Sequence, residues 1–268
     1  MRKYLVAFLS VFVLLLQSCV QEGTYEVTGN LSLPDGAVIT LWPDDHYHQI
    51  AGTVLKDNKF SLAIEGLQDG VYDVIISWPD PNFWDTKKKN GSFIATPDSL
   101  YTNLALYLES GQDYHITTTV TDYKTVFAAT SQNLYPYPLT VKTGSPNTND
   151  LHQIQQKWQK ITVAYRKKMD SLNVLTRLYQ DKNDMASYGR TMILLQGLDK
   201  NFYQAERFKA TKNFIENHKA SAISAYLIAT APNLREDKKY FESALKQLDP
   251  SLKDSRYTKE AQRRVALN

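Results

Sequence analysis

Cys19 is the only cysteine of the 268-residue chain, and its surroundings indicate lipidation. A basic start at Arg2 and Lys3 is followed by an almost wholly apolar run at 4–16 and by a lipobox-like Leu-Gln-Ser directly before the thiol. A membrane span needs about 20 apolar residues, so this shorter run is typical of a signal peptide. We therefore predict a lipoprotein signal peptide at 1–18; the alternative is a buried N-terminal element with an incidental cysteine.

Lipidation of Cys19 would attach the protein to a membrane and would leave it without a reactive thiol. Two or more acyl chains anchor a protein stably, so we expect a cell-envelope protein attached to a membrane by lipid, on the periplasmic side of the outer membrane. No acidic run follows the cysteine, which leaves surface display without support. An acylated thiol cannot act as a nucleophile or redox group.

Asp44, His46 and His48 form the best metal-like group in the sequence. In an extended segment, residues two apart point to the same face, so the carboxylate and the two imidazoles could approach one ion. Structural zinc takes four ligands, and further ligands are not evident nearby. We therefore expect a solvated loop and predict neither a metal nor another cofactor.

Aromatic residues gather around the predicted loops, with Trp42, Tyr47 and Trp84 as the best candidates for ligand binding. Such side chains could stack on a sugar or a peptide, although anchoring of loops and core packing are the alternative role. The identity of any small-molecule ligand stays open. The sequence also contains no Gly-x-Ser-x-Gly, no His-Glu-x-x-His and no phosphate-cradling glycine loop, so we predict that the protein is not an enzyme.

The charge balance argues against a nucleic-acid partner. The chain has 31 Lys+Arg and 28 Asp+Glu, and removal of 1–18 takes away Arg2 and Lys3, which leaves 29 against 28. A mature chain that is nearly neutral has no electrostatic footprint for a polyanion. About 250 residues suffice for one large domain or two small ones.

The elements that carry these residues change character near 144. Before it, β-branched and aromatic runs alternate with Gly, Pro, Asn and Asp, which predicts an N-terminal β domain at 19–144, an antiparallel β-sandwich or open barrel. Asp57 and Asn58 predict a tight hairpin turn. The expected strands lie at 25–32, 38–42, 50–56, 59–64, 71–78, 103–109, 114–120 and 139–142.

After 144 the hydrophobic period becomes helical, so we predict an α-helical domain at 145–268 and an α+β fold overall. Apolar residues recur at three- and four-residue spacing over 151–178 and again over 185–208. The break at 181–183 predicts a long antiparallel helical hairpin. Shorter helices are expected at 221–230, 234–248 and 257–266.

Several segments resemble an uncharacterised N-terminal accessory domain of Bacteroidetes-type lipoproteins. They are the hairpin at 52–62, the Gly-x-Tyr strand at 70–72, the strand and turn at 107–111, and the helical segments 214–221 and 248–255. In that family a thioredoxin-like domain of the TlpA/ResA kind often follows. Here no Cys-x-x-Cys occurs, and no functional residue is carried over from the accessory domain.

We therefore expect a lipid-anchored cell-envelope protein with a binding or assembly role, a possible envelope protein partner and no catalysis of its own. One alternative, implied by the resemblance, is an accessory role in periplasmic thiol–disulfide metabolism beside a separate thioredoxin-like protein. A second alternative is a surface glycan-binding lipoprotein that uses the loop aromatics.

Overall fold

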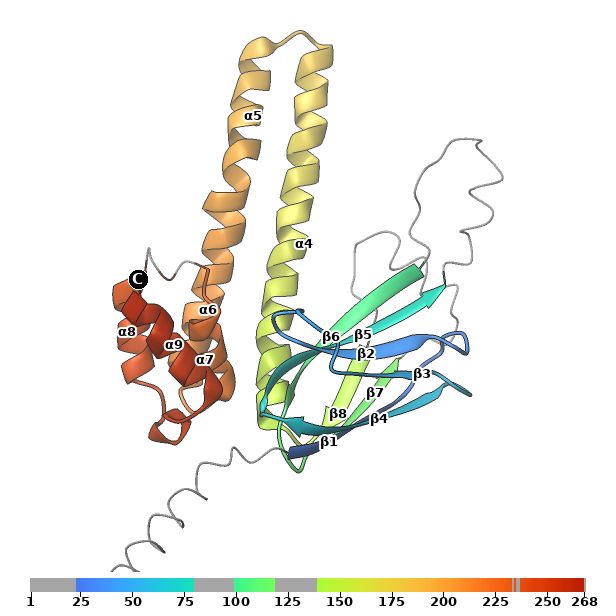
Figure 1. Ribbon diagram of the computed structural model, residues 1–268. Helices are drawn as coiled ribbons and strands as arrows, with labels where there is room; N and C mark the ends of the chain where they lie inside the picture. Colours follow the sequence, from blue (N-terminus) through green and yellow to red (C-terminus); the bar gives the residue numbers. More distant parts are fainter. Residues whose placement is uncertain (1–22, 80–98, 119–138, 233, 235–236, 268) are drawn as a thin grey trace, which may run out of the picture.

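The computed structural model describes residues 23–79, 99–118, 139–232, 234 and 237–267 (Figure 1). Cys19 and Trp84 lie outside the described residues. The protein is α+β, with two four-stranded sheets followed by helices. The strands are β1 (Gly23–Asn30), β2 (Val38–Pro43), β3 (Ala51–Val54), β4 (Lys59–Leu67), β5 (Gly70–Pro79), β6 (Ser99–Leu108), β7 (Asp113–Thr118) and β8 (Leu139–Thr143).

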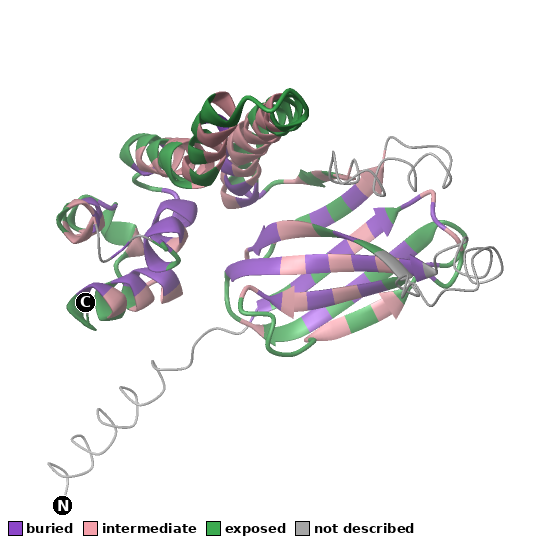
Figure 2. Ribbon diagram, turned by 90° about the horizontal axis from the view of Figure 1, so that it is seen from above, coloured by how far each residue is buried: buried purple, intermediate pink, exposed green. Residues whose placement is uncertain are grey.

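The two sheets face each other across one hydrophobic core. One has the strand order β4-β1-β7-β8 and the other β3-β2-β5-β6. Residues alternate between buried and exposed along the strands, as Figure 2 shows, because successive side chains of a strand point to opposite faces. Val27, Ile39, Val74 and Ile116 are fully buried in this core and come from both sheets. Asp57 and Asn58 both have positive φ, 51° and 62°, which confirms the predicted tight turn.

One sheet is mixed, which corrects the prediction of an entirely antiparallel β domain. β1 pairs antiparallel with β4 but parallel with β7, from Glu26 opposite Asp113 to Asn30 opposite Thr117. The chain leaves β6 in one sheet and crosses through the short segment 109–112 to the other sheet. The direction of β7 is therefore set by this crossing and not by a hairpin with β1. Alternating hydrophobicity identifies a strand but says nothing about the direction of its neighbour.

Helices make up the second half of the chain. The α-helices are α4 (Pro146–Asp181), α5 (Met185–Leu198), α6 (Ala205–Asn217), α7 (Ala222–Ala229), α8 (Lys238–Lys246) and α9 (Arg256–Leu267). A π-helix, η2 (Asp199–Gln204), joins α5 to α6, and a short 3₁₀ helix, η3 (Pro250–Leu252), precedes α9. The sequence predicted one regular helix over 185–208, whereas the structure has a π-helical turn at 199–204 between α5 and α6.

α4 and α5 form an arm that projects from the rest of the protein (Figure 1). α4 has 36 residues and is about 54 Å long at 1.5 Å per residue. Its buried side chains are Thr148, Leu151 and Ile154, all in the first turns, beside the β half. The only buried residue of α5 is Thr191. Beyond its base, the arm is therefore held mainly by packing of the two helices on each other.

A second core joins the helices to the sheet β3-β2-β5-β6. Val71 and Tyr107 lie on the outer face of this sheet, and both are buried in one cluster with Phe214, Ile228 and other residues of α4 and of α6 to α9. The Thr148 hydroxyl donates to the carbonyl oxygen of Tyr107 at 2.8 Å, and the backbone N–H of Tyr107 donates to the same hydroxyl at 3.1 Å. The β and helical parts therefore share buried polar contacts as well as apolar ones.

Candidate functional site

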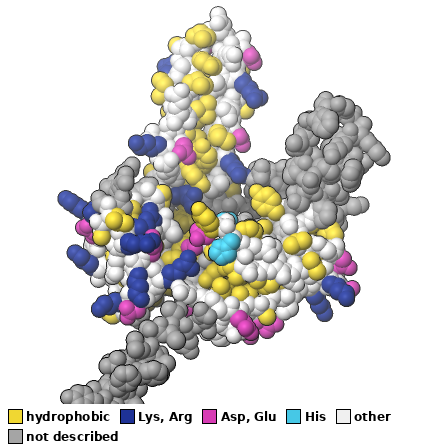
Figure 3. All heavy atoms as spheres, viewed as in Figure 1, with side chains coloured by type: hydrophobic (Ala, Val, Ile, Leu, Met, Phe, Trp, Pro, Cys, Tyr) yellow, Lys and Arg dark blue, Asp and Glu magenta, His cyan; other side chains and the backbone are white. Residues whose placement is uncertain are grey.

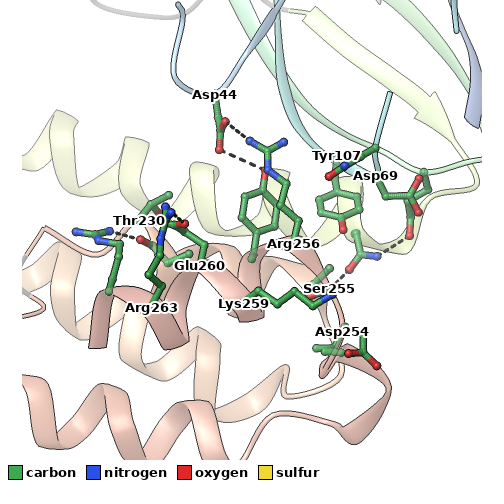
Figure 4. A pocket seen from close by; sticks show the side chains of 18 of the residues that line it. Asp44, Asp69, Tyr107, Thr230, Asp254, Ser255, Arg256, Lys259, Glu260 and Arg263 are labelled. Carbon is green, nitrogen blue, oxygen red and sulfur yellow. Dashed lines mark hydrogen bonds and ion pairs between the residues drawn. The ribbon is translucent and has the colours of Figure 1, made fainter. Parts of the chain in front are cut away.

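An open cleft of about 1190 Å³ lies at the seam between the β half and the short helices (Figure 4). It is walled by the end of β2, the turn between β4 and β5, the end of β6, the start of α4, and α7 and α9. Its charged and polar lining includes Asp44, Asp45, Gln68, Asp69, Glu109, Asn147, Asp254, Arg256, Lys259, Glu260, Arg263 and Arg264.

Asp44 stands at the centre of this seam and binds two residues of α9. Its carboxylate accepts from the Arg256 guanidinium at 3.0 Å and from the Tyr257 hydroxyl at 3.3 Å (Figure 4). The same Tyr257 oxygen accepts a 2.8 Å hydrogen bond from the buried backbone N–H of Val71. Burial raises the pKa of Tyr257, so its hydroxyl stays protonated and can donate to Asp44. These contacts hold α9 against the sheet β3-β2-β5-β6.

A second set of contacts at the seam centres on Glu109, just after β6. Its carboxylate accepts from the Ser145 hydroxyl and, at 2.6 Å, from the Asn147 side-chain amide. Ser145 also caps α4 by accepting from the Thr148 backbone N–H at 3.0 Å. The side-chain Oδ1 of Asn147 accepts from the backbone N–H of Ala222 at 2.8 Å, at the start of α7. These polar groups thus join β6, α4 and α7.

Asp44, His46 and His48, the candidate metal ligands of the sequence, do not share a partner. Asp44 pairs with Arg256, whereas His46 lies 2.6 Å from the carboxylate of Asp73 on β5. His48 is exposed. Among the residues that the structure describes, no three His, Cys, Asp or Glu side chains are grouped so that they could hold a metal ion.

The structure describes two of the three loop aromatics, Trp42 and Tyr47. The Trp42 ring lies half-buried on the outer face of its sheet, and its indole N–H donates to the Thr40 hydroxyl at 2.9 Å. Tyr47 is 89% exposed in the loop after β2. Trp84 is outside the described residues, so the structure gives no position for it relative to the other two.

The projecting arm carries the other conspicuous feature, a set of exposed large apolar side chains. Hydrophobic side chains extend along the arm on the face seen in Figure 3. Ile193 is 69% exposed, Val174 66% and Leu194 59%. Leu175, Leu178 and Met185 complete the set. Surface patches of this kind mark sites of interaction.

The apolar spacing over 151–178 and 185–208 predicted two helices, and nothing in the sequence singled out the residues that stay exposed. A hairpin of two helices leaves part of its apolar surface uncovered, and Val174, Ile193 and Leu194 lie on that part. Arg256, Tyr257 and Asn147 were missed for another reason: they act across the seam, with partners such as Asp44 that lie far away in the sequence.

No family model matches the chain, and no curated protein matches it. Among solved structures, a crystal structure of (S)-allantoin synthase is similar over 46% of this chain and 44% of that chain, with 14% identity and a TM-score of 0.25. The chain thus matches less than half the length of that protein, and a likeness this weak carries no argument. None of the helices in the described part of the chain is both long and apolar enough to cross a membrane.

Proposed function

We propose that the protein is a lipid-anchored component of the cell envelope, held to a membrane through Cys19, that binds another envelope protein and catalyses no reaction. The observation that carries the binding role is the set of exposed apolar side chains on the arm, Ile193, Leu194 and Val174 above all. The anchor is supported by the sequence at 1–19, where a basic start, a short apolar run and a lipobox-like segment follow one another.

The arm is suited to docking because it stands away from the body and has spare apolar surface. Full burial of an exposed Ile or Leu contributes about 1.5–3 kcal/mol. Ile193 and Leu194 are both more than half exposed, so their burial against a partner would contribute roughly 2–4 kcal/mol together. The partner that fits is an envelope protein with a complementary apolar helix or groove.

The proposal is tested by purification of the anchored protein from detergent-solubilised membranes. We expect a co-purifying protein in stoichiometric amount, and we expect I193Q/L194Q to reduce its recovery at least tenfold, because about 1.4 kcal/mol corresponds to a tenfold change in affinity. Q196A is the matched control, since Gln196 is an exposed polar residue of the same helix. Equal recovery with I193Q/L194Q and with Q196A would refute docking through this surface.

The resemblance to accessory domains of lipoproteins supports a second candidate for the partner's identity, a separate thioredoxin-like protein. The chain's sole thiol is the proposed anchor at Cys19, so any thiol–disulfide exchange would be carried out by the partner. Mass spectrometry of the co-purifying protein tests this candidate, and a partner without a Cys-x-x-Cys would exclude a thioredoxin-like protein.

A further inference from the structure

A separate cavity of about 500 Å³ lies inside the helical half, away from the exposed apolar residues of the arm. Its volume falls within the range of about 300–1,000 Å³ that is typical of small-molecule sites. It is lined by residues of α4, η2, α6 and α7, by the segment after α7, and by α8. The lining is mostly aromatic and apolar: Trp158, Tyr203, Phe208, Tyr226, Leu227, Ala231, Pro232 and Phe241.

Arg207 is the one charged residue among the twelve described residues that line this cavity. Its guanidinium stacks 4.4 Å from the centre of a Trp158 ring and 5.4 Å from that of Tyr203. One of its N–H groups donates to the Tyr203 hydroxyl at 3.0 Å. None of the ion pairs formed within the described part of the chain includes Arg207. A half-buried cation thus lines an aromatic cavity, and none of the described carboxylates forms an ion pair with it.

The rings around Arg207 are held in place by their own contacts. The Trp158 indole N–H donates to the Thr211 hydroxyl at 3.3 Å, and that hydroxyl donates to the backbone carbonyl of Arg207 at 2.9 Å. Tyr203 packs on Tyr165 with ring centres 5.0 Å apart. The guanidinium is therefore oriented before any ligand arrives, which lowers the entropy cost of binding.

The π-helix η2 supplies Tyr203 and adjoins the helix of Arg207. A π-helical turn inserts extra residues into a helix and rotates the following side chains, and such turns occur frequently at functional sites. The turn lies where the arm meets the body, which is where this cavity is found. Burial raises the pKa of Tyr226, another lining residue, to about 12, so this side chain is neutral, and Arg207 alone among the described lining residues carries a charge.

We propose that this cavity binds a small organic anion with a flat aromatic body, whose carboxylate is held by Arg207. A guanidinium has five N–H donors in a fixed plane and binds carboxylates in a bidentate manner. The Trp158 and Tyr203 rings lie against the guanidinium, and the hydrogen bond to the Tyr203 hydroxyl uses one of its five N–H donors, which leaves other N–H groups for a ligand. The aromatic and aliphatic walls then cover the body of the ligand.

The test uses two probes, indole-3-acetate and 2-naphthoate, each beside its neutral amide. Binding to the purified protein without residues 1–18 is measured by isothermal titration calorimetry and by ligand-observed NMR. We expect both acids to bind, and each acid to bind at least tenfold more tightly than its amide, since only the acid gains a charge-assisted contact.

Two arginine variants locate the binding. R207Q is expected to weaken binding of the acids at least tenfold and that of the amides by much less. R190Q is the matched control, because Arg190 is an exposed arginine of α5 whose guanidinium donates to the Ser187 hydroxyl, far from the residues that line the cavity, and it should leave all four affinities unchanged. Circular dichroism verifies that both variants are folded.

Three results would overturn the proposal. One is the failure of both acids to bind at millimolar concentration. Another is equal affinity for acid and amide, which would mean that the carboxylate is not recognised. The third is undiminished binding by folded R207Q. Retained partner binding through Ile193 and Leu194 would leave the proposed docking role intact in each case.

Discussion

Removal of a single oxygen atom at the seam, in Tyr257→Phe, tests the account of how the helical half is joined to the sheet. The Tyr257 side chain is 3% exposed, and its hydroxyl accepts from the Val71 backbone N–H and donates to Asp44. The ring fills the same space in Phe. The variant therefore removes the two polar contacts and little else.

The expected cost follows from what the two partners lose. Asp44 keeps its ion pair with Arg256, whereas the buried N–H of Val71 is left without an acceptor. An unsatisfied buried donor costs about 1–3 kcal/mol. We therefore expect the free energy of unfolding to fall by about 1–3 kcal/mol, with Tm falling by about 2–4 °C for each kcal/mol.

Urea titration followed by circular dichroism measures this change, with Tyr101→Phe as the control. Tyr101 is 71% exposed on β6, and loss of its hydroxyl should change the unfolding free energy by less than about 0.5 kcal/mol. If Tyr257→Phe is as stable as the Tyr101 variant, the hydroxyl does not hold the seam together and the reasoning fails.

Three further predictions concern other parts of the molecule. Burial lowers the pKa of His152 below its usual 6.5, so the unfolded state binds a proton more readily than the folded state and the free energy of unfolding should fall as the pH drops below about 6.5. Urea titrations at pH 8 and pH 5 measure this fall, which should be smaller in His152→Gln; an equal fall in the variant would refute the role of His152. Ser145→Ala removes the cap of α4 and a donor to Glu109, so stability measured by thermal unfolding should fall by about 0.5–2 kcal/mol, and a loss smaller than that would contradict the capping role. Cys19→Ala should abolish incorporation of labelled palmitate into the protein in living cells, and a variant that is still labelled would refute acylation at Cys19.

The strands and most of the helices could be predicted from the sequence because each depends on a local pattern. All eight expected strands overlap observed strands, and the turn at Asp57 and Asn58 is present. The parallel pairing of β1 with β7 could not be predicted, since it depends on where the chain crosses between sheets. The π-helix at 199–204 was not predicted, because the apolar residues keep their helical spacing on both sides of it.

The candidate sites were harder to predict, because their residues meet only after folding. Asp44 was noticed beside His46, its neighbour in sequence, but it pairs with Arg256 from the far end of the chain. Trp158 was assigned to a helical stripe, and nothing local indicated that Arg207 would stack on it. Residue types and spacing predict the elements, whereas these contacts depend on how the elements pack.

Photo-crosslinking in living cells tests the docking role of the arm most directly. Benzoylphenylalanine is placed at Ile193, or at Gln196 as the control, in the full-length anchored chain. We predict one discrete adduct with another envelope protein at Ile193 and little or none at Gln196. No adduct at Ile193, equal adducts at both positions, or a product that contains only two copies of this chain would contradict the account.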